Sequence, residues 1–282
     1  LWPELFNVGS QIVFAHTSFK WSNLASHNAG VTVVIVGISS VSGLSRRIYS
    51  TTEGETPNAL CREVANINAY LVPAPNIQVE QLANPMQGSS PMQFGNHPYY
   101  GAALICSQEE GREIIRQAPD AGRYIRPFYG STEFIDCSPR SCLWIRDEEA
   151  NEAIKLKPIA QRVELVRASR VAAANGEVSA KAKKRGSGKK KEDASAKKLV
   201  VTPWRFREQV VAGKHTIIVP RVSSENRPYL PVGLLEPRCI VQEKAFAMYD
   251  EPLWNMAIIA SRLHWVWIAT VCVRLRTDFS YS

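Results

Sequence analysis

Aromatic side chains crowd one short segment of this chain. Residues 14–23 read Phe-Ala-His-Thr-Ser-Phe-Lys-Trp-Ser-Asn and lead into an apolar stretch at 31–38. An aromatic loop that feeds a buried strand suits a protein that extracts a base from a duplex and holds it against a ring. Phe19 and Trp21 are the candidate base-stacking residues, although an isolated pair of rings is more often part of a core. The polar residues beside them, expected to line or flank a nucleic-acid channel, are Lys20, Asn23 and Asn28.

A second segment, residues 218–231, reads Ile-Val-Pro-Arg-Val-Ser-Ser-Glu-Asn-Arg-Pro-Tyr-Leu-Pro. Its side chains suit the edges of bases, because arginine can donate two hydrogen bonds to guanine, asparagine can pair with adenine, and glutamate can accept from cytosine. The candidate DNA-binding residues here are Lys214, Arg221, Ser223, Ser224, Glu225, Asn226 and Arg227.

The basic members of this set favour backbone phosphates over bases, since half or more of protein–DNA hydrogen bonds go to phosphate and sugar. We expect this role for Lys214, Arg221 and Arg227. The alternative is a plain Ser-Glu-Asn turn with a surface ion pair between Glu225 and Arg227, worth about 0–1 kcal/mol. Residue types alone leave both readings open.

The positive charge of the chain is concentrated in one place. Of the net charge of +8, a net +7 lies in residues 181–198, which hold eight Lys and one Arg against Glu192 and Asp193. The composition of this run predicts a disordered, solvated insertion. It also permits a protein that binds RNA or DNA without sequence preference, in which case deleting 181–198 should abolish binding.

Cysteine and histidine give no sign of a metal or redox site. The six Cys are scattered and the five His lack ligand spacing, so we expect free thiols, no metal and no nameable catalytic residue. No apolar run approaches the roughly 20 residues that cross a bilayer, and 45% hydrophobic residues supply a core. A cytoplasmic protein without membrane contact is expected, of undetermined oligomeric state.

Local patterns predict a mixture of helices and strands. The branched residues at 31–38 predict a strand covered on both faces. A capping box at 107–110 predicts a helix to about residue 118. The remaining expected elements are strands at 124–129 and 142–145, a helix from 147 that Pro158 breaks in two, a hairpin over 210–219 turning at Gly213 with two more strands before Glu243, and one or two buried helices over 253–275.

Five blocks, in order, resemble the fused restriction and modification enzymes of the MmeI type. The first is the aromatic segment, which is similar to the end of an adenine-modifying methyltransferase domain. The second is 218–231, similar to part of a target recognition domain. The others are 84–96, 123–135 with 142–145, and 277–282. The lysine-rich insertion and Asp136-Cys-Ser-Pro139 depart from the pattern.

The resemblance implies an α+β fold, in which the remnant of an α/β methyltransferase sheet precedes a mixed α/β recognition domain. It divides the chain into a methyltransferase remnant (1–42), a connector (43–65), a target recognition domain (66–248, with the insertion at 181–198) and the start of a helical segment (249–282). The chain opens on Leu-Trp-Pro-Glu without an initiator Met, so we interpret it as a piece of a longer protein.

For the intact enzyme, the resemblance implies methyl transfer from S-adenosylmethionine to adenine N6 in double-stranded DNA, coupled to a Mg-dependent nuclease domain. The family's cofactor loop and Asn-Pro-Pro-aromatic motif precede this region, so the piece alone is expected to be inactive. The rival is a non-catalytic specificity subunit of a multi-subunit restriction system. Such subunits duplicate their recognition domain, and no duplicated half or heptad run is found in this sequence.

Overall fold

The computed structural model describes residues 1–21, 31–51, 59–80, 82, 85, 88–177, 193–272, 274–275 and 278–281. Within them the chain forms two compact units. Unit 1 comprises Leu1–Asn84, Ser224–Asn226 and Val266–Ser282, and unit 2 comprises Pro85–Ser223 and Arg227–Trp265. Among the described residues, no helix has both the length and the apolar character that a membrane span requires.

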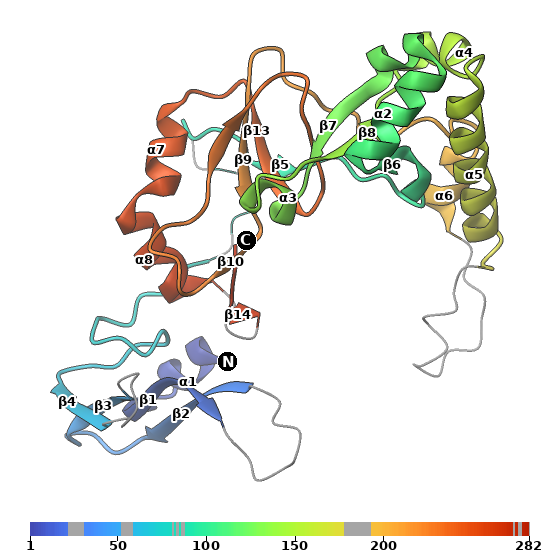
Figure 1. Ribbon diagram of the computed structural model, residues 1–282. Coiled ribbons are helices and arrows are strands. Elements are labelled where there is room, and N and C mark those ends of the chain that lie inside the picture. The colour runs from blue at the N-terminus through green and yellow to red at the C-terminus, as the bar shows by residue number, and fades with distance from the viewer. Residues whose placement is uncertain are drawn as a thin grey trace. The chain divides into compact units, whose positions relative to one another are not determined.

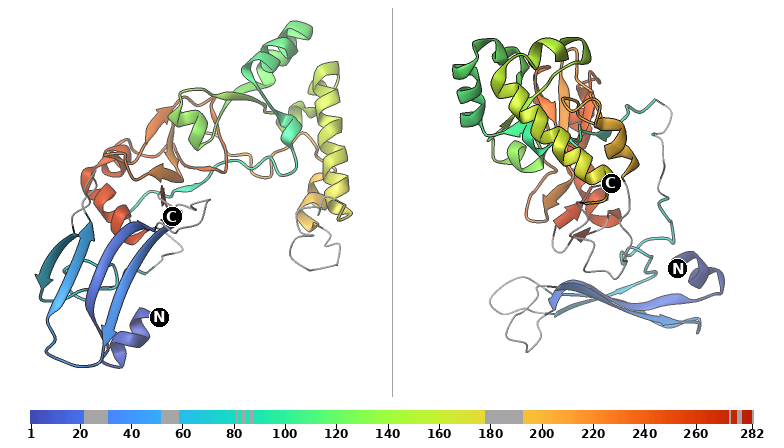
Figure 2. Two further views of the ribbon diagram at one scale, coloured as in Figure 1. Left: turned by 60° about the horizontal axis from the view of Figure 1, so that its bottom comes forward. Right: turned by 90° about the vertical axis from the view of Figure 1, so that its right-hand side faces the viewer.

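Unit 1 is built on a four-stranded sheet in the order β2-β1-β3-β4 (Figures 1 and 2). β1 (Gln11–Trp21) pairs antiparallel with β2 (Val31–Ser39) and parallel with β3 (Arg46–Thr51), which pairs antiparallel with β4 (Ala59–Val64). The strand expected at 31–38 is confirmed. β3 and β4 occupy most of the predicted connector at 43–65 and pack apolar side chains on the core of the sheet.

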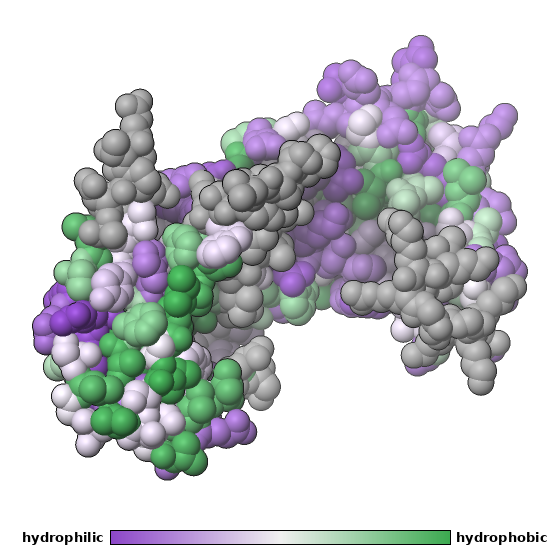
Figure 3. Space-filling model, turned by 90° about the horizontal axis from the view of Figure 1, so that it is seen from below, coloured by the Kyte–Doolittle hydropathy of each residue, from purple (hydrophilic) through white to green (hydrophobic). Residues whose placement is uncertain are grey.

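The sheet of unit 1 has one packed face and one open face. The packed face holds the buried Ile12 and Ala15, against helix α1 (Trp2–Asn7) and Ile67. The other face leaves Phe14 41% and Ile35 45% exposed, so the prediction that 31–38 is covered on both faces is wrong for the described residues. Figure 3 shows apolar side chains gathered on this face.

Unit 2 contains two further sheets, in the orders β11-β9-β13-β5 and β12-β7-β8-β6. The first joins β5 (Gln93–Phe94), β9 (Thr216–Pro220), β11 (Gly233–Leu235) and β13 (Ala245–Tyr249). The second joins β6 (Ile105–Cys106), β7 (Ile125–Tyr129), β8 (Arg140–Leu143) and β12 (Ile240–Val241). The other short strands of the chain are β10 (Val222–Ser224), β14 (Arg274–Leu275) and β15 (Asp278–Ser280).

The helices of unit 2 follow their sequence signals. Ser107 and Glu110 form the predicted capping box of α2 (Gln108–Gln117). Pro158 lies in the first turn of α5 (Lys157–Ala174) and separates it from α4 (Ala150–Ala153), as predicted. The other α-helices of unit 2 are α3 (Ser131–Ile135), α6 (Ala194–Leu199) and α7 (Trp254–Ala260). Helix α8 (Arg262–Val271) begins in unit 2 and ends in unit 1.

Three local expectations need correction. The predicted hairpin at Gly213 does not form, because the backbone groups of residues 210 and 213–215 bond to the side chains of Asn96 and Asp250 instead. Only β9 forms in this region, and it pairs with β11 and β13. Three short strands, not two, lie between β9 and Glu243. The helices over 253–275 are only partly buried, since Trp254 remains 51% exposed.

The end of the lysine-rich run is helical, against the prediction that the whole run is disordered. Residues 178–192 lie outside the described residues, but α6 occupies Ala194–Leu199 at its end. Asp193 caps this helix by accepting from the N–H groups of Ser195 and Ala196, and it also accepts from the Tyr99 hydroxyl at 2.8 Å. Tertiary contacts therefore override the composition here.

Arg170 on α5 is the largest fully buried side chain of the described core. Its five N–H groups donate to five backbone carbonyls, at 2.6–3.2 Å, from residues 98, 99, 199, 202 and 205. Burial lowers its pKa to about 10, which leaves the guanidinium protonated at neutral pH. One side chain thus joins α5 to the end of α6 and to two loops.

Candidate nucleic-acid interface

Two β-bulges in β1 decide which side chains share a face of the unit 1 sheet. The pairing with β2 steps from His16↔Ile35 to Phe19↔Val33, three residues on β1 against two on β2. The extra residue shifts the alternation of faces by one position. Phe19 therefore lies on the face of His16, although the two are an odd number of residues apart.

The result is a stripe of rings along β1, here called the β1 stripe: Phe14, His16, Phe19 and Trp21. The His16 and Phe19 ring centroids are 4.6 Å apart at 66°, and those of Phe19 and Trp21 are 6.3 Å apart at 50°. Phe19 is half-buried and Trp21 is 50% exposed, so the outermost ring has a free surface at the end of the strand. The structure thus brings the two predicted stacking residues together and adds His16, which the sequence did not single out.

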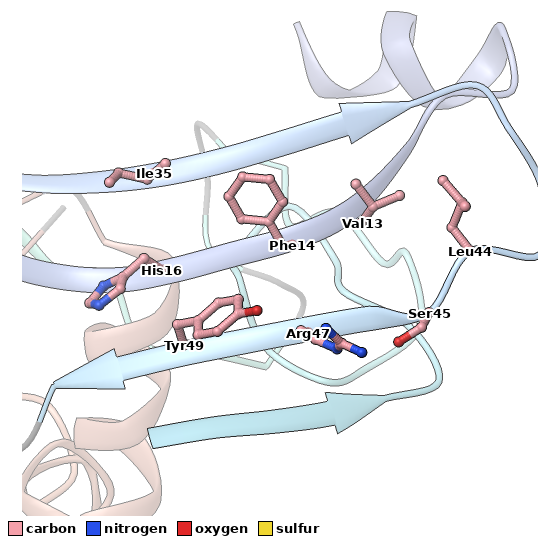
Figure 4. A pocket seen from close by; sticks show the side chains of 8 residues that line it. All are labelled: Val13, Phe14, His16, Ile35, Leu44, Ser45, Arg47 and Tyr49. Atoms are coloured by element: carbon pink, nitrogen blue, oxygen red, sulfur yellow. The ribbon is translucent and has the colours of Figure 1, made fainter. Parts of the chain in front are cut away.

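A hollow of about 600 Å³ lies beside the stripe on the open face (Figure 4). Phe14 and His16 of β1 line it together with Ile35 of β2 and Tyr49 of β3. Phe14 and Tyr49 meet edge to face, with centroids 6.5 Å apart. The lining is mainly apolar and aromatic, with Arg47 as its cation, a composition typical of sites for flat organic groups.

Part of the predicted set falls outside the described residues. Asn23 and Asn28 lie in the undescribed segment 22–30, and only the backbone of Lys20 is described, within β1. Their role in a nucleic-acid channel stays a prediction.

Arg221 stands in an aromatic cluster of unit 2. Its guanidinium lies 4.7 Å from the Phe94 ring centroid and 5.6 Å from that of Phe246. These two phenylalanines pair across β5 and β13, 5.0 Å apart, and Phe94 is 56% exposed. The cluster therefore combines a cation with an exposed ring, two features of surfaces that bind nucleic acid.

The residues after Arg221 differ in their access to solvent. Ser223 in β10 is only 2% exposed, a position that suits packing rather than contact with a base. Ser224 is half-buried, and its hydroxyl accepts from the backbone N–H of Asn226 at 3.3 Å. Glu225 and Arg227 are half-buried and Asn226 is exposed, which makes Asn226 the most accessible candidate reader of the turn.

Lys214 lies at the tip of a loop that a single carboxylate holds. The N–H groups of Gly213, Lys214 and His215 donate to Asp250 at 2.6, 2.6 and 3.0 Å. These bonds, that from Gly213 first, lower the pKa of Asp250. The backbone of the loop is thus fixed while the Lys214 side chain is exposed, as a phosphate contact requires.

Gly95 allows β5 to reach the segment at 241–242, and so positions Phe94 beneath Arg221. A Cβ at Gly95 would come within 2.6 Å of the Val241 carbonyl oxygen and closer still to that of Gln242. We expect Gly95→Ala to lower the free energy of unfolding by about 1–3 kcal/mol or more. The new methyl group would clash with backbone atoms, which cannot move aside as the end of a side chain can. Urea unfolding measures this, with Gly122→Ala as control, where the nearest atom is an ordinary 3.9 Å away. Equal stabilities of the two variants would contradict the close approach.

In the described part of the chain, no group of three or more His, Cys, Asp and Glu side chains is placed to hold a metal ion. None of the six cysteines, all of which lie within the described residues, forms a disulfide. Burial raises the pKa of Cys106, Cys142 and Cys239, so these thiols stay protonated and unreactive at neutral pH. The side chains of the candidate interface are therefore rings, cations, hydroxyls and amides, with no metal-binding cluster among the described residues.

Comparison with known proteins agrees with this arrangement. The family model described as the target recognition domain of MmeI matches residues 73–282, and that of the MmeI DNA-methyltransferase domain matches residues 1–50. A curated relative, DNA methyltransferase A of Bacillus subtilis (strain 168), is 35% identical over all of this chain, which spans 29% of that protein. The solved structure of the type IIL restriction-modification enzyme MmeI in complex with DNA superposes over all of this chain with a TM-score of 0.82 at 26% identity, and the chain spans 35% of it.

Proposed function

Because the chain belongs to the MmeI family, we propose that it recognises duplex DNA in sequence-specific fashion and captures the target base within an adenine-N6 methyltransferase of a restriction-modification system. The β1 stripe carries this proposal. It places a row of rings in edge and tilted contact, the last of them half exposed, in the region that matches the methyltransferase domain. A base extracted from a duplex needs such a ring to replace the stacking it has lost.

In this proposal the residues between 214 and 227 supply recognition. Arg221 and Lys214 contact backbone phosphates, and Asn226 reads a base edge from its exposed turn. Ser224, Glu225 and Arg227 shape that turn. The similar MmeI enzyme was solved in complex with DNA, which supports a duplex as the partner of this chain.

The methyl donor proposed for the whole enzyme is S-adenosylmethionine. The residues of this chain do not fit its site, because the sequence contains neither an Asn-Pro-Pro-aromatic motif nor a glycine-rich loop between a strand and a helix. We therefore assign no step of methyl transfer to these residues. We expect the isolated chain to transfer no methyl group to DNA, and labelled S-adenosylmethionine with the purified chain tests this.

Binding of duplex DNA is the direct test. We expect the chain to shift the anisotropy of a labelled duplex drawn from a randomised pool, and to enrich one sequence over rounds of selection. Affinity should fall linearly with salt on logarithmic axes, with a slope of about −0.9 for each phosphate contacted. Deletion of 181–192, which keeps Asp193 and α6, should leave the affinity for the enriched sequence largely unchanged. Binding that is lost with this deletion, or that enriches no sequence, would instead indicate a protein that binds nucleic acid without sequence preference.

A further inference from the structure

Unit 2 contains a basic cavity to which the proposed function gives no role. It measures about 310 Å³ and opens between α2, β7 and the start of β8, elements labelled in Figure 1. Its charged lining consists of four arginines and no carboxylate: Arg112, Arg126, Arg140 and Arg238. We call it the arginine pocket. A cavity whose charges all share one sign raises the local concentration of the opposite ion.

Two of the four guanidinium groups form hydrogen bonds or an ion pair within the protein. The Arg140 Nε lies 2.7 Å from Glu133 Oε1, and its Nη2 donates to Gln242 Oε1 at 3.2 Å. Arg238 donates one longer bond, at 3.3 Å, to the carbonyl of Ile125. Arg140 therefore lines the pocket with its guanidinium held by Glu133 and Gln242, while most donors of Arg238 remain available to a ligand.

The guanidinium groups of the other two arginines have all their donors available. Among the described residues, Arg112 and Arg126 have no hydrogen-bond or ion-pair partner, whereas several exposed arginines nearby are paired with a carboxylate. Arg126 is half-buried on β7, and burial lowers its pKa, with smaller contributions from the positive charges of Arg146 and Arg238 that the charge of Glu149 partly offsets. A partly desolvated cation without an ion-pair partner is costly, so the position is best explained by a ligand that supplies the anion.

The chemistry of the lining selects the ligand. Guanidinium groups offer planar, forked donors that match the oxygens of a phosphate, and such charge-assisted pairs are stronger than neutral hydrogen bonds. Gln108 and Ser141 supply further polar groups at the wall. The volume lies at the lower end of the range for small ligand sites, enough for a phosphate group.

We propose that the arginine pocket binds one backbone phosphate of duplex DNA, and that Arg112, Arg126 and Arg238 provide the contacts. The inference rests on the proposed function, since it takes duplex DNA as the partner. It adds a phosphate contact at a distance in sequence from the 214–227 region. Because a phosphodiester is present at every step of the duplex, this contact positions the recognition domain without reading a base.

The test compares two pocket variants with a matched control on the same helix. Arg126→Gln and Arg112→Gln each remove from the pocket a cation that has no ion-pair partner among the described residues. Arg116→Gln removes an exposed cation of α2 that is paired with Glu113 at 2.8 Å and lies outside the pocket. Anisotropy of a labelled duplex is measured at several salt concentrations, and thermal unfolding checks that each variant is folded. Arg112 is exposed, so its variant decides the question if Arg126→Gln fails to fold.

We expect both pocket variants to weaken binding about tenfold for every duplex sequence alike, and to reduce the salt slope by about 1. Arg116→Gln should stay within about twofold of the parent chain. In a duplex with single uncharged methylphosphonate linkages, one linkage should weaken the parent chain but not the pocket variants. Free inorganic phosphate at constant ionic strength should compete only weakly.

The outcomes separate this inference from the proposed function. Normal DNA binding with unchanged affinity and salt slope in both pocket variants would overturn the arginine pocket alone. Stabilisation of the parent chain by inorganic phosphate, without any change in DNA binding in the variants, would assign the pocket to free phosphate and also overturn it. Absence of DNA binding by the parent chain would refute the function and the pocket together.

Discussion

Arg170→Met is expected to unfold much of unit 2, with a loss of about 3–5 kcal/mol in the free energy of unfolding. The substitution keeps an unbranched side chain of suitable length but removes all five donors. The carbonyls of Leu199 and Thr202 keep a backbone N–H donor, while those of Pro98, Tyr99 and Arg205 lose the donor that Arg170 supplied. Removing one partner of a buried charged network costs the desolvation of the groups left behind. Urea denaturation followed by tryptophan fluorescence measures the loss.

Two companion variants test the reason for this effect. Arg170→Lys keeps the charge but offers three donors to five carbonyls, so it should recover only part of the stability. Arg167→Met removes a half-buried arginine of the same helix, which is paired with Glu164 at 3.2 Å and donates one long bond, at 3.5 Å, to the carbonyl of Val200. It should cost no more than about 1 kcal/mol. If Arg167→Met were as destabilising as Arg170→Met, the carbonyl contacts would not be the cause.

Trp21→Ala and Phe19→Ala are expected to weaken capture of the target base about 5- to 150-fold. Each removes a ring of the β1 stripe, and loss of one stacked base contact costs about 1–3 kcal/mol. The enriched duplex from selection serves as ligand, and 2-aminopurine placed at each adenine in turn identifies the extruded base by its fluorescence. Affinity for that duplex is then compared between variants.

Ring-retaining variants separate stacking from support of the fold. Trp21→Phe and Phe19→Tyr should keep most of the affinity, because any flat ring can stack on a base. Trp254→Ala removes a tryptophan of equal exposure, 51% against 50%, and should leave DNA affinity unchanged. Because Trp21 lies at the surface, its variant should fold normally. If the folded Trp21→Ala and Phe19→Ala variants bound DNA with full affinity, the proposed stacking role of these rings would be refuted.

Strong local signals predicted the elements that depend on neighbours in sequence. The capping box of Ser107 and Glu110 and the break at Pro158 lie where the sequence placed them. Each depends on one turn of backbone, which a short stretch of residues specifies. The α+β fold and the link between an aromatic strand and a recognition domain followed from the order of the five blocks.

Contacts between distant residues could not be predicted in this way. The alternation of faces in a strand places His16 and Phe19 on opposite sides, and only the pairing with β2 reveals the bulge that unites them. The helix at the end of the lysine-rich run depends on Asp193 and its bond from Tyr99, which is 94 positions away. The arginine pocket likewise joins α2 to Arg238.

The five carbonyl contacts of Arg170 have a practical consequence for protein engineering. They hold the two sides of the 178–192 segment through α5 and α6, independently of the residues between. The entropic cost of a longer loop grows only with the logarithm of its length. A fluorescent protein or an affinity tag grafted between Glu177 and Asp193 should therefore leave the rest of the chain undisturbed, and provide a label for the binding experiments that test the proposed function.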